Sequence, residues 1–230
     1  MTVSSIRWKR GIYVVKSAKV TAYAQVKEWI KESILSGEIP AGSRITVAEI
    51  IEKYGVSQMP VREAFQILQG EGFIELLPHR GARVLSLTPQ YLTNIYEIRG
   101  VVEGLLAKRS MPHLTISGLN RLKELNRQME GMVQAGIAAE ELVKLDRQFH
   151  VAIYENSNNP EGMLIYEKYV GLIGSLRNKY GYSSERLADM VKQHWLMIDA
   201  LQNQDANMLV QIVQAHSEGA MLDLLKAMDN

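Results

Sequence analysis

The sequence contains no cysteine among its 230 residues. Disulfides and thiolate metal sites are therefore excluded, and this cysteine usage is typical of a cytoplasmic protein. The apolar runs all fall short of the roughly 18 residues that a membrane-spanning helix needs. The N-terminal sequence also lacks the apolar core of a secretory signal, and the chain has no internal repeat or low-complexity tract. We expect a cytoplasmic protein of one or two domains with no membrane association.

The net charge of +1 conceals an uneven distribution. Residues 1–85 carry 12 Lys and Arg against 8 Asp and Glu, a net charge of +4, whereas residues 86–230 carry 14 against 17, a net charge of −3. Residues 1–18 are basic and are expected to form a flexible tail. A basic front half indicates a polyanionic partner, although an ordinary solvated surface explains the charge alone equally well.

Residues 19–87 have the periodicities of a winged helix-turn-helix domain. Apolar spacing predicts helices at about 19–36 and 46–53, separated by the helix-breaking segment "SGEIPAGSR". A third helix follows Ser57, whose side chain can cap it, and its buried stripe is predicted at Val61, Ala64, Phe65 and Leu68. The segments "FIELL" and "ARVLSL" then predict two strands around the basic hairpin tip "PHRG".

The third helix is expected to enter the major groove, with its N-terminal residues toward the base edges. Arginine binds guanine bidentately and glutamine binds adenine, while the hairpin tip is expected at the minor groove or backbone. The predicted DNA-binding residues are Arg44, Ser57, Gln58, Met59, Arg62, His79, Arg80 and Gly81. A merely solvated helix face is the alternative, and the turn, the hairpin and the charge asymmetry together favour DNA binding.

The second half of the chain reads as helical throughout. The segment "SLTPQY" is the expected joint, where Thr88 can cap a helix and Pro89 suits its first position. Helices are predicted near 89–110, 116–135, 139–156, 161–180, 184–203 and 206–228, which together make an all-α six-helix bundle. The expected fold is mainly α, with three helices and a β-hairpin wing joined to this bundle.

Four residues of the second half have the types and spacing of a metal site. Asp146 precedes His150 by four residues, so both side chains lie on one helix face. His194 and His216 come from two further helices, and helical bundles build metal sites from such inward-facing side chains. Imidazole and carboxylate ligands favour zinc first, with nickel, manganese or iron as other candidates. The alternative is that each histidine is a hydrogen-bonded core residue.

The stretch "VSQMPVREAF", followed by "GEGFIELLPHRGARV", resembles the N-terminal domain of GntR-family transcription regulators over about residues 20–87. The family's common pattern has Arg and Thr where this chain has Gln58 and Met59. That arginine is usually a DNA contact, so the resemblance implies an altered operator preference here.

Residues 88–230 resemble the FCD ligand-binding domain of the FadR-type branch, most like its six-helix VanR subgroup. The matching pieces are "IYEIRGVVEGLLAKRS", "LDRQFHVAIYENSNNP", "QHWLMIDALQNQD" and "AHSEGAM". Metal-binding members use an Asp, a His four residues later and two further His, which match Asp146, His150, His194 and His216. One departure is Lys192-Gln193, where an acidic residue is common.

Arg99 matches an arginine near the effector pocket of that family. A guanidinium suits a bidentate carboxylate, and an ion pair with Glu103, four residues later, is the alternative. The resemblance implies a DNA-binding transcription regulator, mostly a dimeric repressor of metabolic genes. Its C-terminal domain would bind a divalent metal and a small carboxylate or sugar-acid effector that alters operator binding. A helical metalloenzyme, for which no HExxH motif is present, and a regulator with a purely structural metal are the alternatives.

Overall fold

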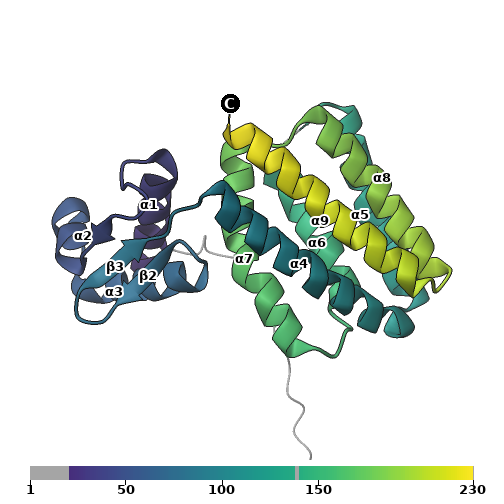
Figure 1. Cartoon of the computed structure of the whole chain (residues 1–230), viewed down its shortest axis with the longest axis horizontal. Helices are drawn as coiled ribbons and strands as arrows, with labels where there is room; N and C mark the ends of the chain where they lie inside the picture. The colour runs from purple at the N-terminus through teal and green to yellow at the C-terminus, as the bar shows by residue number, and fades with distance from the viewer. Residues whose placement is uncertain (1–20, 138–139, 230) are drawn as a thin grey trace, which may run out of the picture.

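The computed structural model describes residues 21–137 and 140–229, so the tail expected at 1–18 lies outside the described residues. A small part with three helices and a sheet lies beside a larger all-helical bundle (Figure 1). The chain passes from the first part to the second just before α4. In the described ranges, no helix is both long and apolar enough to cross a membrane.

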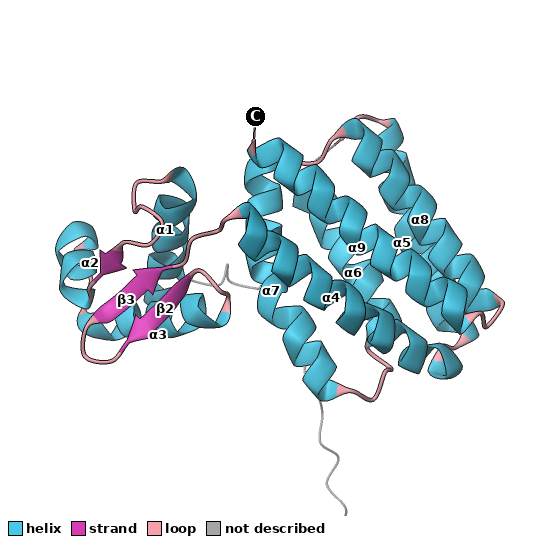
Figure 2. Cartoon of the chain, in the orientation of Figure 1, coloured by secondary structure: helices cyan, strands magenta, loops and turns pink. Residues whose placement is uncertain are grey.

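The first part contains three helices and three strands. The helices are α1 (Ala22–Ser36), α2 (Val47–Tyr54) and α3 (Gln58–Gly70). The strands are β1 (Arg44–Ile45), β2 (Ile74–Leu77) and β3 (Gly81–Val84). They form an antiparallel sheet in the order β1-β3-β2, with Ile74 opposite Val84 and Leu77 opposite Gly81. The predicted helices and hairpin are confirmed (Figure 2).

Local signals fix the ends of these helices. Thr46 and Glu49 form a reciprocal capping box at the start of α2, and Gly55 ends this helix with φ of 65°. Ser57 stands at the N-cap of α3 with an extended backbone. However, among the described residues its side chain makes no capping hydrogen bond, so the predicted side-chain cap is wrong.

The second part contains the six predicted α-helices. They are α4 (Pro89–Ser110), α5 (Ile116–Gln134), α6 (Glu140–Tyr154), α7 (Pro160–Tyr180), α8 (Ser184–Gln202) and α9 (Ala206–Met228). Thr88 caps α4 by accepting a hydrogen bond from the Tyr91 N–H, as predicted, and Pro89 opens the helix. A short 3-10 helix, η1 (Met111–His113), occupies the segment expected to be a loop. Helices α4 and α9 lie side by side along one face (Figure 1).

Two apolar clusters stabilise the structure. One fills the bundle and includes Phe149, Met197 and Val213. The other fills the small part and continues into the bundle through residues of α4, α7 and α9, namely Leu92, Ile95, Tyr96, Leu172, Ile173, Leu176 and Leu224. The two parts therefore share buried apolar surface, which stabilises their contact at roughly 25 cal/mol per Å².

We expect Gly81→Ala to lower the free energy of unfolding by more than about 1 kcal/mol. Gly81 has a φ of +89°, and a Cβ there would lie 2.2 Å from the carbonyl oxygen of Ile45. The substitution would force β3 away from β1 next to the hairpin turn. Urea unfolding of the two proteins measures the change.

Gly131→Ala is the matched control. Gly131 lies inside α5, and a Cβ there meets no described atom within 4 Å. Alanine at this position should raise the free energy of unfolding by about 0.5–1 kcal/mol. Equal effects of the two substitutions would contradict the argument.

Candidate metal centre and effector cavity

Three helices bring the predicted metal ligands to one point inside the bundle. Asp146 and His150 project from α6, His194 from α8 and His216 from α9. One ligand atom from each side chain can be chosen so that all four lie within 4.8 Å of one another. The three histidines are buried, and Asp146 is partly exposed. The four-residue spacing on α6 places Asp146 and His150 together, and the packing of the helices brings His194 and His216 to them.

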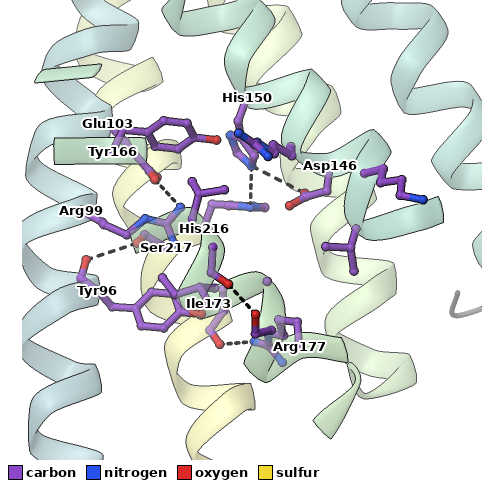
Figure 3. Close-up of a pocket in the computed structure, with 18 of the residues that line it drawn as sticks. Tyr96, Arg99, Glu103, Asp146, His150, Tyr166, Ile173, Arg177, His216 and Ser217 are labelled. Atoms are coloured by element: carbon purple, nitrogen blue, oxygen red, sulfur yellow. Dashed lines mark hydrogen bonds and ion pairs between the residues drawn. The ribbon is translucent and has the colours of Figure 1, made fainter. Parts of the chain in front are cut away.

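The distances at this cluster leave unsatisfied polar atoms. Asp146 Oδ1 lies 3.6 Å from His150 Nε2, and the Nε2 atoms of His150 and His216 lie 3.2 Å apart (Figure 3). Asp146 Oδ1 also lies 3.5 Å from His194 Nε2. Asp146 Oδ1 and His194 Nε2 are buried and have no hydrogen-bond partner within the described part of the chain. Such atoms destabilise a fold by about 1–3 kcal/mol each. A cation between them would satisfy both, so these residues fit a metal.

The outer nitrogen of each imidazole has an oxygen partner. His150 Nδ1 lies 3.1 Å from the Tyr154 hydroxyl, His194 Nδ1 lies 3.2 Å from Asn126 Oδ1, and His216 Nδ1 lies 3.0 Å from Gln193 Oε1. With the proton on Nδ1, the rings of His150 and His194 present the lone pair of Nε2 toward the centre. His216 Nδ1 also lies 3.2 Å from Arg186 Nη2, which can only donate to it. Outer contacts of this kind fix the orientation and tautomer of metal-binding histidines.

Two of these outer partners, Tyr154 and Asn126, were not identified from the sequence. The third, Gln193, was noted only because an acidic residue is common at that place in the family. Asn126 comes from α5, and its amide nitrogen donates to the Val191 carbonyl oxygen at 3.1 Å. Gln193 stands where an acidic residue was expected, and it also accepts a 2.8 Å hydrogen bond from Arg186. An i, i+4 search from His150 would have found Tyr154. The other two depend on how α5, α8 and α9 pack.

Burial and local charge hold the cluster in ligand-competent protonation states. Burial lowers the pKa of His194 to about 3 and that of His216 well below its usual value, so both imidazoles are neutral near pH 7. Burial alone would raise the pKa of Asp146, but attraction to His150, His194 and Arg186 outweighs it and lowers this pKa to about 2. A carboxylate and neutral imidazoles are the forms that bind metals.

A cavity of about 260 Å³ adjoins the cluster. Asp146, His150 and His216 line it from the cluster side, and side chains of α4 and α7 line the rest, including Arg99. Arg99 Nη2 also donates to Glu103 Oε1 at 2.5 Å. The ion pair considered from the sequence is therefore formed, and it is formed inside the cavity wall (Figure 3).

Helix α7 separates this cavity from the small domain. Tyr166, Ile173 and Arg177 face the cavity. Gly171 also lines the cavity, and a Cβ there would lie 3.5 Å from the Glu71 side chain of the small domain. The Lys179 ammonium on the same helix donates to the Leu35 carbonyl oxygen. The helix is thus a wall one helix thick between the cavity and the winged helix-turn-helix.

Most of the predicted DNA-binding residues are exposed in the structure. Ser57, Gln58, Met59 and Arg62 lie at the start of α3, and Met59 is 65% exposed. With its amide oxygen toward the arginine, Gln58 accepts hydrogen bonds from Arg62 Nε at 2.9 Å and Nη2 at 2.7 Å. The two residues expected to contact bases therefore form a pair that must open, or move together, to reach DNA.

The remaining predicted contacts lie at the wing. His79 and Arg80 are exposed in the turn between β2 and β3, and Gly81 begins β3. Arg44 is one of the predicted DNA-binding residues, and its Nε donates to the Arg80 carbonyl oxygen at 2.6 Å. This bond connects β1 to the hairpin tip. Strand β1 was not predicted from the sequence, and its formation makes this contact possible.

Comparisons with known proteins agree with this architecture. Residues 94–219 match the FCD domain, and residues 22–84 match the bacterial regulatory proteins of the gntR family. The gluconate operon transcriptional repressor of Bacillus subtilis (strain 168) is 28% identical over 204 residues, covering 84% of this chain and 81% of that protein. The regulator McbR of Escherichia coli (strain K12) is 26% identical over 192 residues, covering 83% and 86%.

A solved structure, that of E. coli McbR/YncC, has the same fold. It superposes with a TM-score of 0.66 at 22% identity, covering 92% of this chain and 100% of that chain. These families and relatives are transcription regulators, which argues against the metalloenzyme alternative. The FCD match alone spans more than half of the chain. The chain belongs to the GntR family of DNA-binding transcription regulators, in the branch with a C-terminal FCD domain.

Proposed function

We propose that the protein is a dimeric cytoplasmic repressor of metabolic genes that responds to a small organic acid through a bound divalent metal. In this proposal residues 19–87 bind operator DNA and residues 88–230 bind the metal, the effector and a second copy. The observation that carries it is the buried cluster of Asp146, His150, His194 and His216, which adjoins a cavity.

Zinc is the first candidate for the metal, and nickel, manganese or iron would also suit three imidazoles and a carboxylate. Four protein ligands close a tetrahedral site, whereas an octahedral site keeps two positions for water or an effector carboxylate. Because Asp146, His150 and His216 also line the cavity, the site supports sensing better than a purely structural role. The bound metal would supply a positive anchor for the acid.

The effector is a small carboxylate or sugar acid. Its cavity is lined by Arg99 and Arg177, and by Arg147, which is exposed on α6. One relative is named a gluconate operon repressor, and that name supports the sugar-acid class. A ligand in this cavity would press on α7, which packs against the small domain through Gly171. To switch DNA binding, the acid must bind two arrangements of α7 with different affinity.

Dimerisation is proposed through the face formed by α4 and α9. Ile98, Val101 and Leu105 are exposed on α4, with Val101 64% exposed, and Met208 and Leu222 are exposed on α9. Exposed apolar side chains gathered on neighbouring helices are typical of an interaction surface. A dimer would present two copies of α3 to successive half-sites of an operator.

We expect Arg62→Ala to weaken specific operator binding by about 1–3 kcal/mol, the usual contribution of a bidentate base contact. Arg62 is exposed near the start of α3. Fluorescence anisotropy with the operator and with unrelated DNA measures both affinities. Loss on the operator alone indicates a base contact, and equal loss on both indicates a phosphate contact. Arg121→Ala removes the same charge from exposed α5 and should change neither. Unchanged operator affinity in the Arg62 variant would exclude the assigned role.

We expect His150→Ala and His216→Ala each to lower the bound metal below one ion per chain, because each removes an inward-facing nitrogen. Metal content is measured by mass spectrometry after dialysis. Operator binding by the effector-free variants should be retained. His113→Ala is the control, since His113 is exposed in η1. Full metal content in both cavity variants would show that the ligands were assigned wrongly.

The effector function is tested by melting temperature against a panel of small carboxylates and sugar acids, first metal-loaded and then chelator-stripped. A ligand of the folded state raises stability by about 2.7 kcal/mol at 100 times its Kd. We expect a selective increase that disappears after stripping. Stabilisation by the metal alone, with no further effect of any acid, would support a structural metal instead.

A further inference from the structure

The exposed start of helix α3 carries a hydrogen-bonded pair of side chains. Gln58 is the first residue of α3 and Arg62 lies four residues later, so both side chains project from one face of the helix. Both residues are exposed. With its amide oxygen toward the arginine, Gln58 accepts from Arg62 Nε at 2.9 Å and from Nη2 at 2.7 Å. The pair therefore occupies the amide oxygen and one edge of the guanidinium.

The guanidinium of Arg62 keeps a second edge that faces away from Gln58. Its contact with Gln58 uses an N–H group of Nε and one of Nη2. The N–H groups of Nη1 and the other N–H group of Nη2 remain, and they form a fork that suits two neighbouring acceptors. Because the partner is a neutral amide and not a carboxylate, Gln58 leaves the positive charge of Arg62 unbalanced. The charge and the free edge are both available to DNA.

The pair presents hydrogen-bond donors and no free side-chain acceptor. Its amide oxygen is occupied by Arg62, and the amide nitrogen of Gln58 only donates. In the major groove guanine shows two acceptors, N7 and O6, whereas adenine shows one acceptor and one donor. A bidentate contact of glutamine with adenine needs the amide oxygen to accept from that donor. The paired side chains therefore match guanine, and Gln58 cannot read adenine in this way while it holds Arg62.

The pair also fixes Arg62 before DNA arrives. An arginine that becomes ordered against a base loses rotamer freedom, which weakens binding by about two- to tenfold for one such side chain. Gln58 removes part of this loss, because it already holds the guanidinium. The helix beneath is itself fixed, since Val61 and Phe65 are buried on its opposite side. The free edge of Arg62 is therefore presented from a fixed position.

We propose that Gln58 is a specificity-determining residue that acts through Arg62. It positions the guanidinium to read a guanine in each operator half-site, and it does not read adenine itself. This inference rests on the proposed role of Arg62 as a base contact. It replaces the separate glutamine–adenine contact that the sequence suggested with a single reading unit of two side chains.

The test selects bound duplexes from a library with about 20 randomised base pairs, enough for two half-sites one helical turn apart, using the full-length chain. Fluorescence anisotropy then gives Kd for the selected duplex and for duplexes in which one guanine or adenine is replaced in both half-sites. We expect Arg62→Ala to abolish the preference for one guanine. Gln58→Ala should lower the preference at that same position by about two- to tenfold, because Arg62 is no longer held. No preference for adenine should be lost.

A double-mutant comparison distinguishes a pair from two independent contacts. In the Arg62→Ala background, Gln58→Ala should have no further effect on base preference. Gln58→Glu should keep the guanine preference, because a carboxylate accepts the same hydrogen bonds, while its charge weakens binding to every duplex. Gln69→Ala is the matched control, because Gln69 is an exposed glutamine of α3 seven residues beyond Arg62. It should leave every base preference unchanged.

Loss of an adenine preference in Gln58→Ala, with the guanine preference intact, would show that Gln58 reads a base directly and would overturn the inference. Equal effects of Gln58→Ala with and without Arg62, or no effect on any base preference, would overturn it as well. These outcomes leave the proposed base contact of Arg62 standing. If Arg62→Ala itself changes no base preference, that proposed contact and this inference fail together.

Discussion

The burial of one carboxylate and three imidazoles inside an apolar bundle is the constraint on which this structure depends. Asp146 and the three histidines project inward from α6, α8 and α9. The printed distances between their inward-facing oxygen and nitrogen atoms are 3.2–3.6 Å. Unpaired polar atoms at this depth oppose folding, so the arrangement is stable only if each is satisfied. Tyr154, Asn126 and Gln193 satisfy the outer nitrogens. The inner atoms fit a cation, and under the proposed function the adjoining cavity would give an acid access to it.

Helix α7 contacts both the cavity and the DNA-binding part. Tyr166 and Ile173 face the cavity, and Leu172 belongs to the apolar cluster that fills the small domain. Glu71 of that domain lies next to Gly171, at 3.5 Å from the position a Cβ would take there. A switch requires one element that contacts both sites, and α7 contacts both the cavity and the small domain. It would also require the ligand to bind two positions of α7 with unequal affinity.

Two exposed arginines of the small domain, both predicted to contact DNA, already bind a neighbouring group of the protein. Arg62 faces solvent on α3 and pairs with Gln58, and Arg44 holds the backbone of the wing at Arg80. Sequence periodicity identified these positions as exposed, but it cannot reveal that an exposed side chain already has a partner. Arg99 is a similar case inside the bundle, because it pairs with Glu103 and also lines the cavity.

The sequence by itself determined the elements whose signals are local. Apolar periodicity defined the helices, Thr88 and Pro89 marked the start of α4, and the spacing of Asp146 and His150 put both on one face of α6. Only the tertiary structure decided the rest. Strand β1 has two residues and exists through pairing with β3, and the Ser57 side chain makes no capping hydrogen bond to α3. Asn126 and Gln193 reached His194 and His216 from other helices. Local patterns report the backbone within a few residues, whereas these contacts join positions far apart in the chain and depend on how whole helices pack.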